Sequence, residues 1–96
     1  ESLHDLKDFG LNAYILHTPG HTSGSVSIIV EGEIALVGDA MFGILPGSVF
    51  PPFADDPGQL MASWGKLLDT GCSLFLPAHG SAIGRSLLQK EYHRRR

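Results

Sequence analysis

The chain has 96 residues, of which 43% are hydrophobic and 18% charged, and its formal net charge is −3. A chain of this length forms one small domain with a modest core, and this composition excludes a disordered or fibrous protein. No apolar run approaches the roughly 20 residues that a membrane-spanning helix requires, so no membrane partner is expected.

The lone cysteine and the two ends of the chain give expectations about its cellular compartment, its completeness and its partners. The lone Cys72 excludes an internal disulfide and favours a reducing compartment, so we expect a cytoplasmic protein. The chain starts at Glu1 without a basic and apolar leader, and we expect it to be a piece of a longer protein. The basic end, His93 to Arg96, is a short terminal charge run of the kind that is usually solvated, so no nucleic-acid partner is expected.

The first part of the chain predicts three strands. Asn12 to Leu16 has the apolar and aromatic content of a short strand, and Thr18-Pro19-Gly20 ends it. Ser25 to Val30 is a second predicted strand, and Glu31-Gly32 is a tight link to a third, Glu33 to Val37. The second and third strands therefore form a hairpin in one sheet.

A loop and a helix follow. Residues 40–56 mix prolines and glycines with large apolar side chains, which predicts a long irregular loop. Its apolar part, Met41 to Phe53, is expected to cover another part of the molecule. Asp55 or Asp56 caps the helix, with Pro57 at its first position and Gly71 at its end. The apolar side chains recur at helical spacing and are predicted to face the core: Leu60, Met61, Trp64, Leu67 and Leu68.

The last part predicts one more strand and one more helix. Ser73 to Leu76 is a strand predicted to be buried on both faces, because its apolar run is continuous, and it ends at Pro77. Ser81 is expected to cap a last helix whose apolar side is formed by Ile83, Leu87, Leu88 and Tyr92. This order of elements predicts an α/β (α+β) fold class, with a mixed β-sheet and helices packed on one face.

Three polar side chains, those of His21, Asp39 and His79, lie in short turns of small residues beside or after predicted strands. Imidazole and carboxylate together form a ligand set that zinc or iron accepts, and flanking glycines let the backbone turn sharply near a cation. Asp39 lies 18 residues after His21, and His79 lies 40 residues after Asp39, so only a folded sheet can bring them together.

Each of these residues also has a structural interpretation. His21 alone is a turn histidine that bonds nearby carbonyls, Asp39 alone is a loop carboxylate that caps backbone N–H groups, and His79 alone is a strand-end histidine without a metal. His17, four residues before His21, is more simply a structural histidine.

The surrounding motifs carry a family resemblance. Thr18-Pro19-Gly20-His21-Thr22, Gly38-Asp39 and Pro77-Ala78-His79-Gly80 resemble, in this order, the third, fourth and fifth metal-binding motifs of the metallo-β-lactamase superfamily. This superfamily includes the glyoxalase II thioesterases, the lactonases and the β-lactamases. Any one motif is weak, but three in this order and strand context are specific.

The resemblance implies a role for each ligand. His21 corresponds to the last histidine of the first metal site, Asp39 to the catalytic carboxylate that bridges both metals, and His79 to the histidine of the second site. The family's first motif, HxHxDH, is absent, and His4-Asp5 does not replace it. The family fold is a four-layer αββα sandwich of two similar halves, and residues 1–96 resemble its C-terminal half as a single partial domain.

The resemblance also implies a chemistry. In a complete domain two metals, zinc or alternatively iron or manganese, share a water and yield a hydroxide that cleaves an ester-like bond of a small-molecule substrate, of the thioester, lactone or β-lactam class. This chain alone is expected to bind zinc weakly or not at all and to catalyse nothing. The alternative is a catalytically inactive half-domain that acts as an assembly or interaction module. The expected partner is a second copy, in a homodimer, or the missing N-terminal half.

Overall fold

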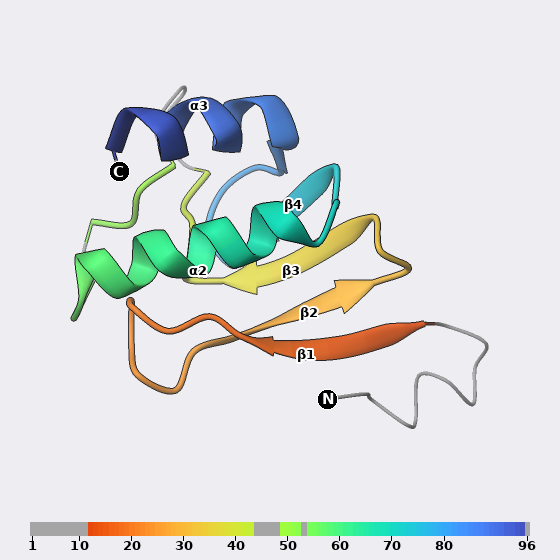
Figure 1. The fold of residues 1–96 in the computed structure, drawn as a ribbon, viewed down its shortest axis with the longest axis horizontal. Helices are drawn as coiled ribbons and strands as arrows, with labels where there is room; N and C mark the ends of the chain where they lie inside the picture. The colour runs from red at the N-terminus through yellow and green to blue at the C-terminus, as the bar shows by residue number, and fades with distance from the viewer. Residues whose placement is uncertain (1–11, 44–48, 53, 96) are drawn as a thin grey trace.

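The computed structural model describes residues 12–43, 49–52 and 54–95 (Figure 1). These residues form a five-stranded sheet and two helices: β1 (Ala13–His17), β2 (Val26–Val30), β3 (Ile34–Gly38), α2 (Pro57–Asp69), β4 (Leu74–Pro77), β5 (Ile83–Gly84) and α3 (Arg85–Arg95). The predicted α/β (α+β) class with a mixed sheet is confirmed. His4, Asp5 and Arg96 lie outside the described residues.

The strands lie side by side in the order in which they occur in the chain. β1, β2 and β3 are antiparallel neighbours, whereas β4 pairs parallel with β3 and antiparallel with β5. Glu31 and Gly32 have positive φ angles of 55° and 65°, which a tight turn between twisted antiparallel strands requires. The predicted hairpin is therefore confirmed, and β1, β2 and β3 each start one residue later than predicted.

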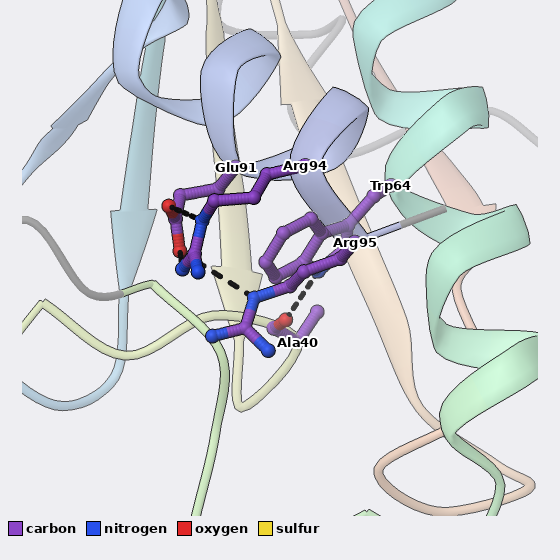
Figure 2. Close-up of polar contacts among 5 residues, drawn as sticks. All are labelled: Ala40, Trp64, Glu91, Arg94 and Arg95. Atoms are coloured by element: carbon purple, nitrogen blue, oxygen red, sulfur yellow. Dashed lines mark hydrogen bonds and ion pairs between the residues drawn. The ribbon is translucent and has the colours of Figure 1, made fainter.

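Helix α2 connects the two parallel strands and begins where the sequence predicts. Of the two candidate caps, Asp56 is used, and its Oδ1 accepts a hydrogen bond from the Gln59 backbone N–H at 3.0 Å. The indole N–H of Trp64 donates to the carbonyl oxygen of Ala40 at 2.7 Å, which ties the helix to the segment after β3 (Figure 2). The predicted apolar stripe packs into the core, with Met61 only partly buried: Leu60, Met61, Trp64, Leu67 and Leu68.

The two faces of the sheet differ in what covers them. On one face, side chains pack with both helices into a single core: Ile29, Ala35, Val37, Phe75 and Ile83. On the other, which we call the open face, aliphatic side chains stay partly exposed: Ile15, Val26, Ile28, Val30, Ile34, Leu36, Leu74 and Leu76. The prediction that β4 is buried on both faces is wrong, because neither helix covers Leu74 and Leu76.

The last helix starts later than predicted. The expectation that Ser81 caps a helix containing Ile83 is wrong, because Ile83 and Gly84 form β5 and α3 begins at Arg85. Ile83 pairs with Phe75 and is buried, so sheet pairing outweighs its helical spacing from the later apolar residues. The rest of the predicted apolar side packs against the core: Leu87, Leu88 and Tyr92.

The structure also bears on the expectations for the lone cysteine and for membrane-spanning segments. Cys72 is a free cysteine buried in the core. Neither helix of the described chain has the length and apolar character that crossing a bilayer requires.

Candidate functional site

The structure brings the three predicted ligands together at one end of the sheet. His21 lies in the turn before β2, Asp39 directly follows β3, and His79 lies just beyond β4. The parallel strands β3 and β4 end on the same side, and the antiparallel β2 starts there, so the topology itself gathers the three turns.

Each histidine approaches a different oxygen of the Asp39 carboxylate. The Nε2 atom of His79 lies 3.2 Å from Oδ1, and the Nε2 atom of His21 lies 3.7 Å from Oδ2. Although His79 is close, Oδ1 is buried and accepts no hydrogen bond within the described chain. A buried carboxylate oxygen without a hydrogen bond is costly, and a bound cation would satisfy it.

The turn that presents His21 is held by close backbone contact with α2. Gly20 has a φ angle of 136°, and a Cβ atom there would lie 2.4 Å from the Leu60 backbone, so only glycine fits. The carbonyl oxygen of Gly20 accepts from the Asp56 N–H at 2.8 Å, and that of His21 accepts from the Asp55 N–H at 3.2 Å. The structural reason for Gly20 is therefore the packing of the turn against the helix.

The turns that carry Asp39 and His79 are joined by backbone hydrogen bonds. The carbonyl oxygen of Gly38 accepts from the Ala78 N–H at 2.9 Å, and that of His79 accepts from the Gly43 N–H at 2.9 Å. A Cβ atom on Gly43 would lie 2.1 Å from a backbone oxygen two residues after His79. The sequence pattern does not single out Gly43, because its requirement comes only from this contact across the fold.

Phe42 forms an apolar wall beside both histidines. Its ring stacks on that of His79 with 4.9 Å between centroids, and it lies 6.5 Å from the tilted ring of His21. Phe42 belongs to the predicted apolar loop, whose Met41 and Val49 are buried in the core, so the loop both packs and contacts the site. Residues 44–48 and 53 of this loop lie outside the described residues.

The donor set suits a divalent cation, but the described residues form no finished metal site. Two imidazoles and a carboxylate match the preferences of zinc and iron. Within residues 12–43, 49–52 and 54–95, however, no group of three or more His, Cys, Asp or Glu side chains is arranged to hold a metal. The N···O distances of 3.2 and 3.7 Å leave room for a cation between each histidine and the carboxylate, because metal–ligand bonds are about 2 Å long, but further ligands must complete each site.

Two other polar features take structural roles. The Nε2 atom of His17 lies 2.9 Å from the carbonyl oxygen of Ser23, in agreement with its structural interpretation. The basic end is not simply solvated, because Arg94 and Arg95 form hydrogen bonds with the buried Glu91 (Figure 2). Hydrogen bonding and charge attraction from Arg94 outweigh burial and lower the pKa of Glu91. The spacing of three and four residues on a helix is the signal that predicts such pairs.

Comparison with solved structures identifies the fold. The chain aligns over 88% of its length, with a TM-score of 0.72 and 22% identity, to 34% of an archaeal metallo-β-lactamase superfamily protein from Sulfolobus tokodaii. It aligns over 85% of its length, with a TM-score of 0.61 and 33% identity, to 41% of a protein crystallised in a di-iron-bound form. The fold is therefore the metallo-β-lactamase fold.

A sequence relative points the same way. A hydroxyacylglutathione hydrolase from Shewanella pealeana is 33% identical over 64 residues, which are 67% of this chain and 24% of that protein. The chain belongs to the metallo-β-lactamase superfamily, a superfamily of metallo-hydrolases. It spans about a quarter of the length of this curated relative. No family model matches the chain.

Proposed function

We propose that this chain is the C-terminal portion of a metal-dependent hydrolase that cleaves an ester-like bond of a small-molecule substrate. The observation that carries the proposal is the carboxylate of Asp39. It meets the Nε2 atom of one histidine at each of its two oxygens, and one of these oxygens is buried without a hydrogen bond. This is the chemistry expected of a carboxylate shared between two cations.

In this proposal the three side chains have distinct metal-binding roles. Asp39 bridges two divalent cations, His21 is a ligand of the first, and His79 is a ligand of the second. Zinc is the proposed metal, with iron or manganese as alternatives, and the similar protein in a di-iron-bound form supports a two-metal site. When bound, such metals supply Lewis-acid activation of water and of the substrate carbonyl.

The other residues of the site position these ligands and shape the substrate's surroundings. The close contact of Gly20 with α2 fixes the position of the turn that carries His21. The hydrogen bond from the Ala78 N–H to the Gly38 carbonyl oxygen holds the turns of Asp39 and His79 together. Phe42 covers one face of the His79 ring and offers the substrate an apolar wall.

The proposed reaction needs no nucleophile from the protein. Water adds to the carbonyl carbon, the bond to the leaving group breaks, and the leaving group takes up a proton. Cys72, the one cysteine of the chain, is buried in the core. Among thioesters, lactones and β-lactams, the name of the hydroxyacylglutathione hydrolase relative favours a thioester.

We also propose that residues 1–96 are the C-terminal half of an αββα sandwich, whose N-terminal half carries the HxHxDH ligands. A stable zinc site needs four ligands, so Asp39 with one histidine per metal is too few. The aliphatic open face is the surface against which the other half would pack. The same surface supports the second candidate function, a catalytically inactive module that acts through assembly.

The test compares the full-length gene product with the 96-residue chain. In the full-length protein, Asp39→Ala is expected to lower the hydrolysis of a glutathione thioester by at least about 100-fold, because both metals lose a shared ligand. The matched control is Asp69→Ala, which removes an exposed carboxylate at the end of α2. In calorimetric titrations, the 96-residue chain is expected to bind zinc more weakly than about 1 μM, since it lacks four ligands per metal.

The possible results separate the two candidate functions. An active full-length protein that is unaffected by Asp39→Ala would remove the bridging role of Asp39. A full-length protein that binds no metal and hydrolyses no thioester, lactone or β-lactam would favour the assembly module.

A further inference from the structure

A hollow lies between the first turn of α2 and the last turn of α3. Its volume is ≈ 510 Å³, and it is lined by Phe50, Pro57, Gly58, Met61, Arg94 and Arg95. Two of these six residues are arginines, and none is acidic. The hollow therefore combines positive charge with apolar surface.

The two arginines are held in place by a buried carboxylate. Arg94 donates to Glu91 from Nε at 3.0 Å and from a terminal nitrogen at 2.9 Å, and the Nε atom of Arg95 donates to the same carboxylate at 3.4 Å (Figure 2). The guanidinium carbon of Arg95 also lies 4.8 Å from the centroid of the Phe50 ring. Anchoring of this kind lowers the entropy that a side chain loses when it binds a ligand.

The anchoring leaves hydrogen-bond donors for a ligand. Of the three guanidinium nitrogens of Arg95, only Nε forms a hydrogen bond with Glu91 (Figure 2). Within the described chain, its two terminal nitrogens have no hydrogen-bond partner. Two arginines against one carboxylate leave an excess of one positive charge, which suits an anionic ligand with two oxygens side by side.

The other residues that line the hollow indicate which chemical group would lie beside the anion. Phe50 and Met61 offer an aromatic ring and a thioether, so a short aliphatic segment can rest on them. No side chain within the first turn of α2 is acidic, and the Asp56 carboxylate that caps this turn accepts a hydrogen bond from the Gln59 N–H. Asp56 already caps this helix, and Pro57 has no backbone N–H, so the arginines supply the main attraction.

We infer that this hollow binds the acidic group, carboxylate or phosphate, of an organic anion whose aliphatic segment lies on Phe50 and Met61. Directly before Pro57, which lines the hollow, the backbone N–H groups of Asp55 and Asp56 form hydrogen bonds with the turn that carries His21. The hollow thus lies at the same end of the molecule as the candidate metal ligands. Its assignment to the acidic end of the substrate rests on the proposed function, whereas anion binding itself does not.

The experiment is a metal-free titration of the 96-residue chain, followed by calorimetry or by NMR chemical shifts. The probes are butyl phosphate and butyrate, with 1-butanol as the uncharged analogue. Arg95→Gln is expected to weaken binding of the better anion about tenfold, because it removes the charged donors but leaves the two bonds from Arg94 to Glu91. The matched control is Lys90→Gln, which removes the same charge from an exposed position on α3 outside the hollow.

Each outcome bears directly on the inference. The anion that binds more tightly identifies the acidic group, and an unchanged affinity in Lys90→Gln supports a localised site. Equal binding of 1-butanol, an unaffected Arg95→Gln variant, or equal weakening by Lys90→Gln would overturn it. Because the titration contains no metal and no hydrolysis, loss of the proposed enzymatic activity would leave this result standing.

Discussion

Glu91 shows how much a single residue's surroundings matter in this small fold. The residue is 3% exposed, and both of its carboxylate oxygens are hydrogen-bonded to Arg94, with a further bond from Arg95. A buried carboxylate without such partners would strongly destabilise the native state. The pair with Arg94 keeps the carboxylate ionised and lowers its pKa below the ordinary value of 4.5.

At this scale we predict that Glu91→Gln destabilises the fold in a pH-dependent way. A pKa lowered by folding means that the ionised pair stabilises the native state above pH 4.5, and that this stabilisation is lost as pH falls through the lowered pKa. We expect the variant to lose roughly 1 kcal/mol of unfolding free energy near neutral pH, because exposed arginines are screened by solvent. Urea unfolding of both proteins at a series of pH values measures the difference.

A carboxylate without ion pairs provides the control for this prediction. Glu33→Gln changes an exposed side chain that has no hydrogen bond or ion pair in the described structure. Its effect is expected to be small at every pH. A Glu91→Gln difference that stays constant, or grows, as pH falls below 4.5 would contradict the assigned role of the pair.

At the scale of elements, the turn before β2 and helix α2 behave as one unit. Gly20 lies directly against the Leu60 backbone, and the carbonyl oxygen of Pro19 accepts a hydrogen bond from the buried Ser63 hydroxyl at 2.7 Å. The position of His21 is therefore determined by the helix as much as by its own strand.

We predict that Gly20→Ala lowers the unfolding free energy by about 3 kcal/mol, because the new methyl group collides with α2 and the φ angle is unfavourable. Gly38→Ala is the matched variant: its φ angle is also positive, but its Cβ atom would meet nothing within 4 Å. It should cost about 1 kcal/mol. Thermal and urea unfolding measure both, and equal losses in the two variants would show that the contact with α2 is unimportant.

The elements also show what a sequence pattern can predict. Helix α2 was predictable because its cap, its Pro57 and its apolar stripe are local signals in adjacent turns. The β2–β3 hairpin was predictable for the same reason. β5 was not, because Ile83 fits a helical stripe equally well and only its pairing with Phe75 decides between them.

In the candidate site, too, some residues were predictable from the sequence and others were not. His21, Asp39 and His79 were predictable because each lies in a small-residue turn at a strand end, and the fold does bring them together. Phe42 and Gly43 were not, because the stacking on His79 and the close approach to the His79 turn are contacts across the fold. The proposed binding role of Arg95 was likewise not predictable, because the hollow that it lines is formed only in the folded chain.

At the scale of the whole molecule, the open face is the main feature to account for. Val26 and Leu36 are 47% and 40% exposed, and the neighbouring aliphatic side chains are only half-buried. Monomeric proteins rarely expose contiguous apolar patches beyond a few hundred Å². We expect that in the 96-residue chain a second copy covers this face and forms a homodimer, sheet against sheet.

Light scattering at micromolar concentration tests this prediction. Leu36→Lys is expected to convert the dimer to a monomer, because a charge at the centre of the contact loses its hydration. The control is Tyr14→Lys, since Tyr14 is similarly exposed, at 38%, but its side chain lies on the opposite face of the sheet. A soluble, well-folded monomer of the unmodified chain would show that no second copy is needed.

The parallel pairing of β3 with β4 also has a consequence for the order of folding. The β2–β3 hairpin closes through a turn at Glu31 and Gly32, whereas β3 meets β4 only after the chain has passed through α2. Closing the longer loop costs more entropy, and contacts between distant residues form more slowly. We therefore expect the hairpin and the helix to form early from local contacts, and Asp39 and His79 to meet later. The proposed site would then exist only once β3 and β4 have paired, so a chain that holds local structure alone could not bind a metal there.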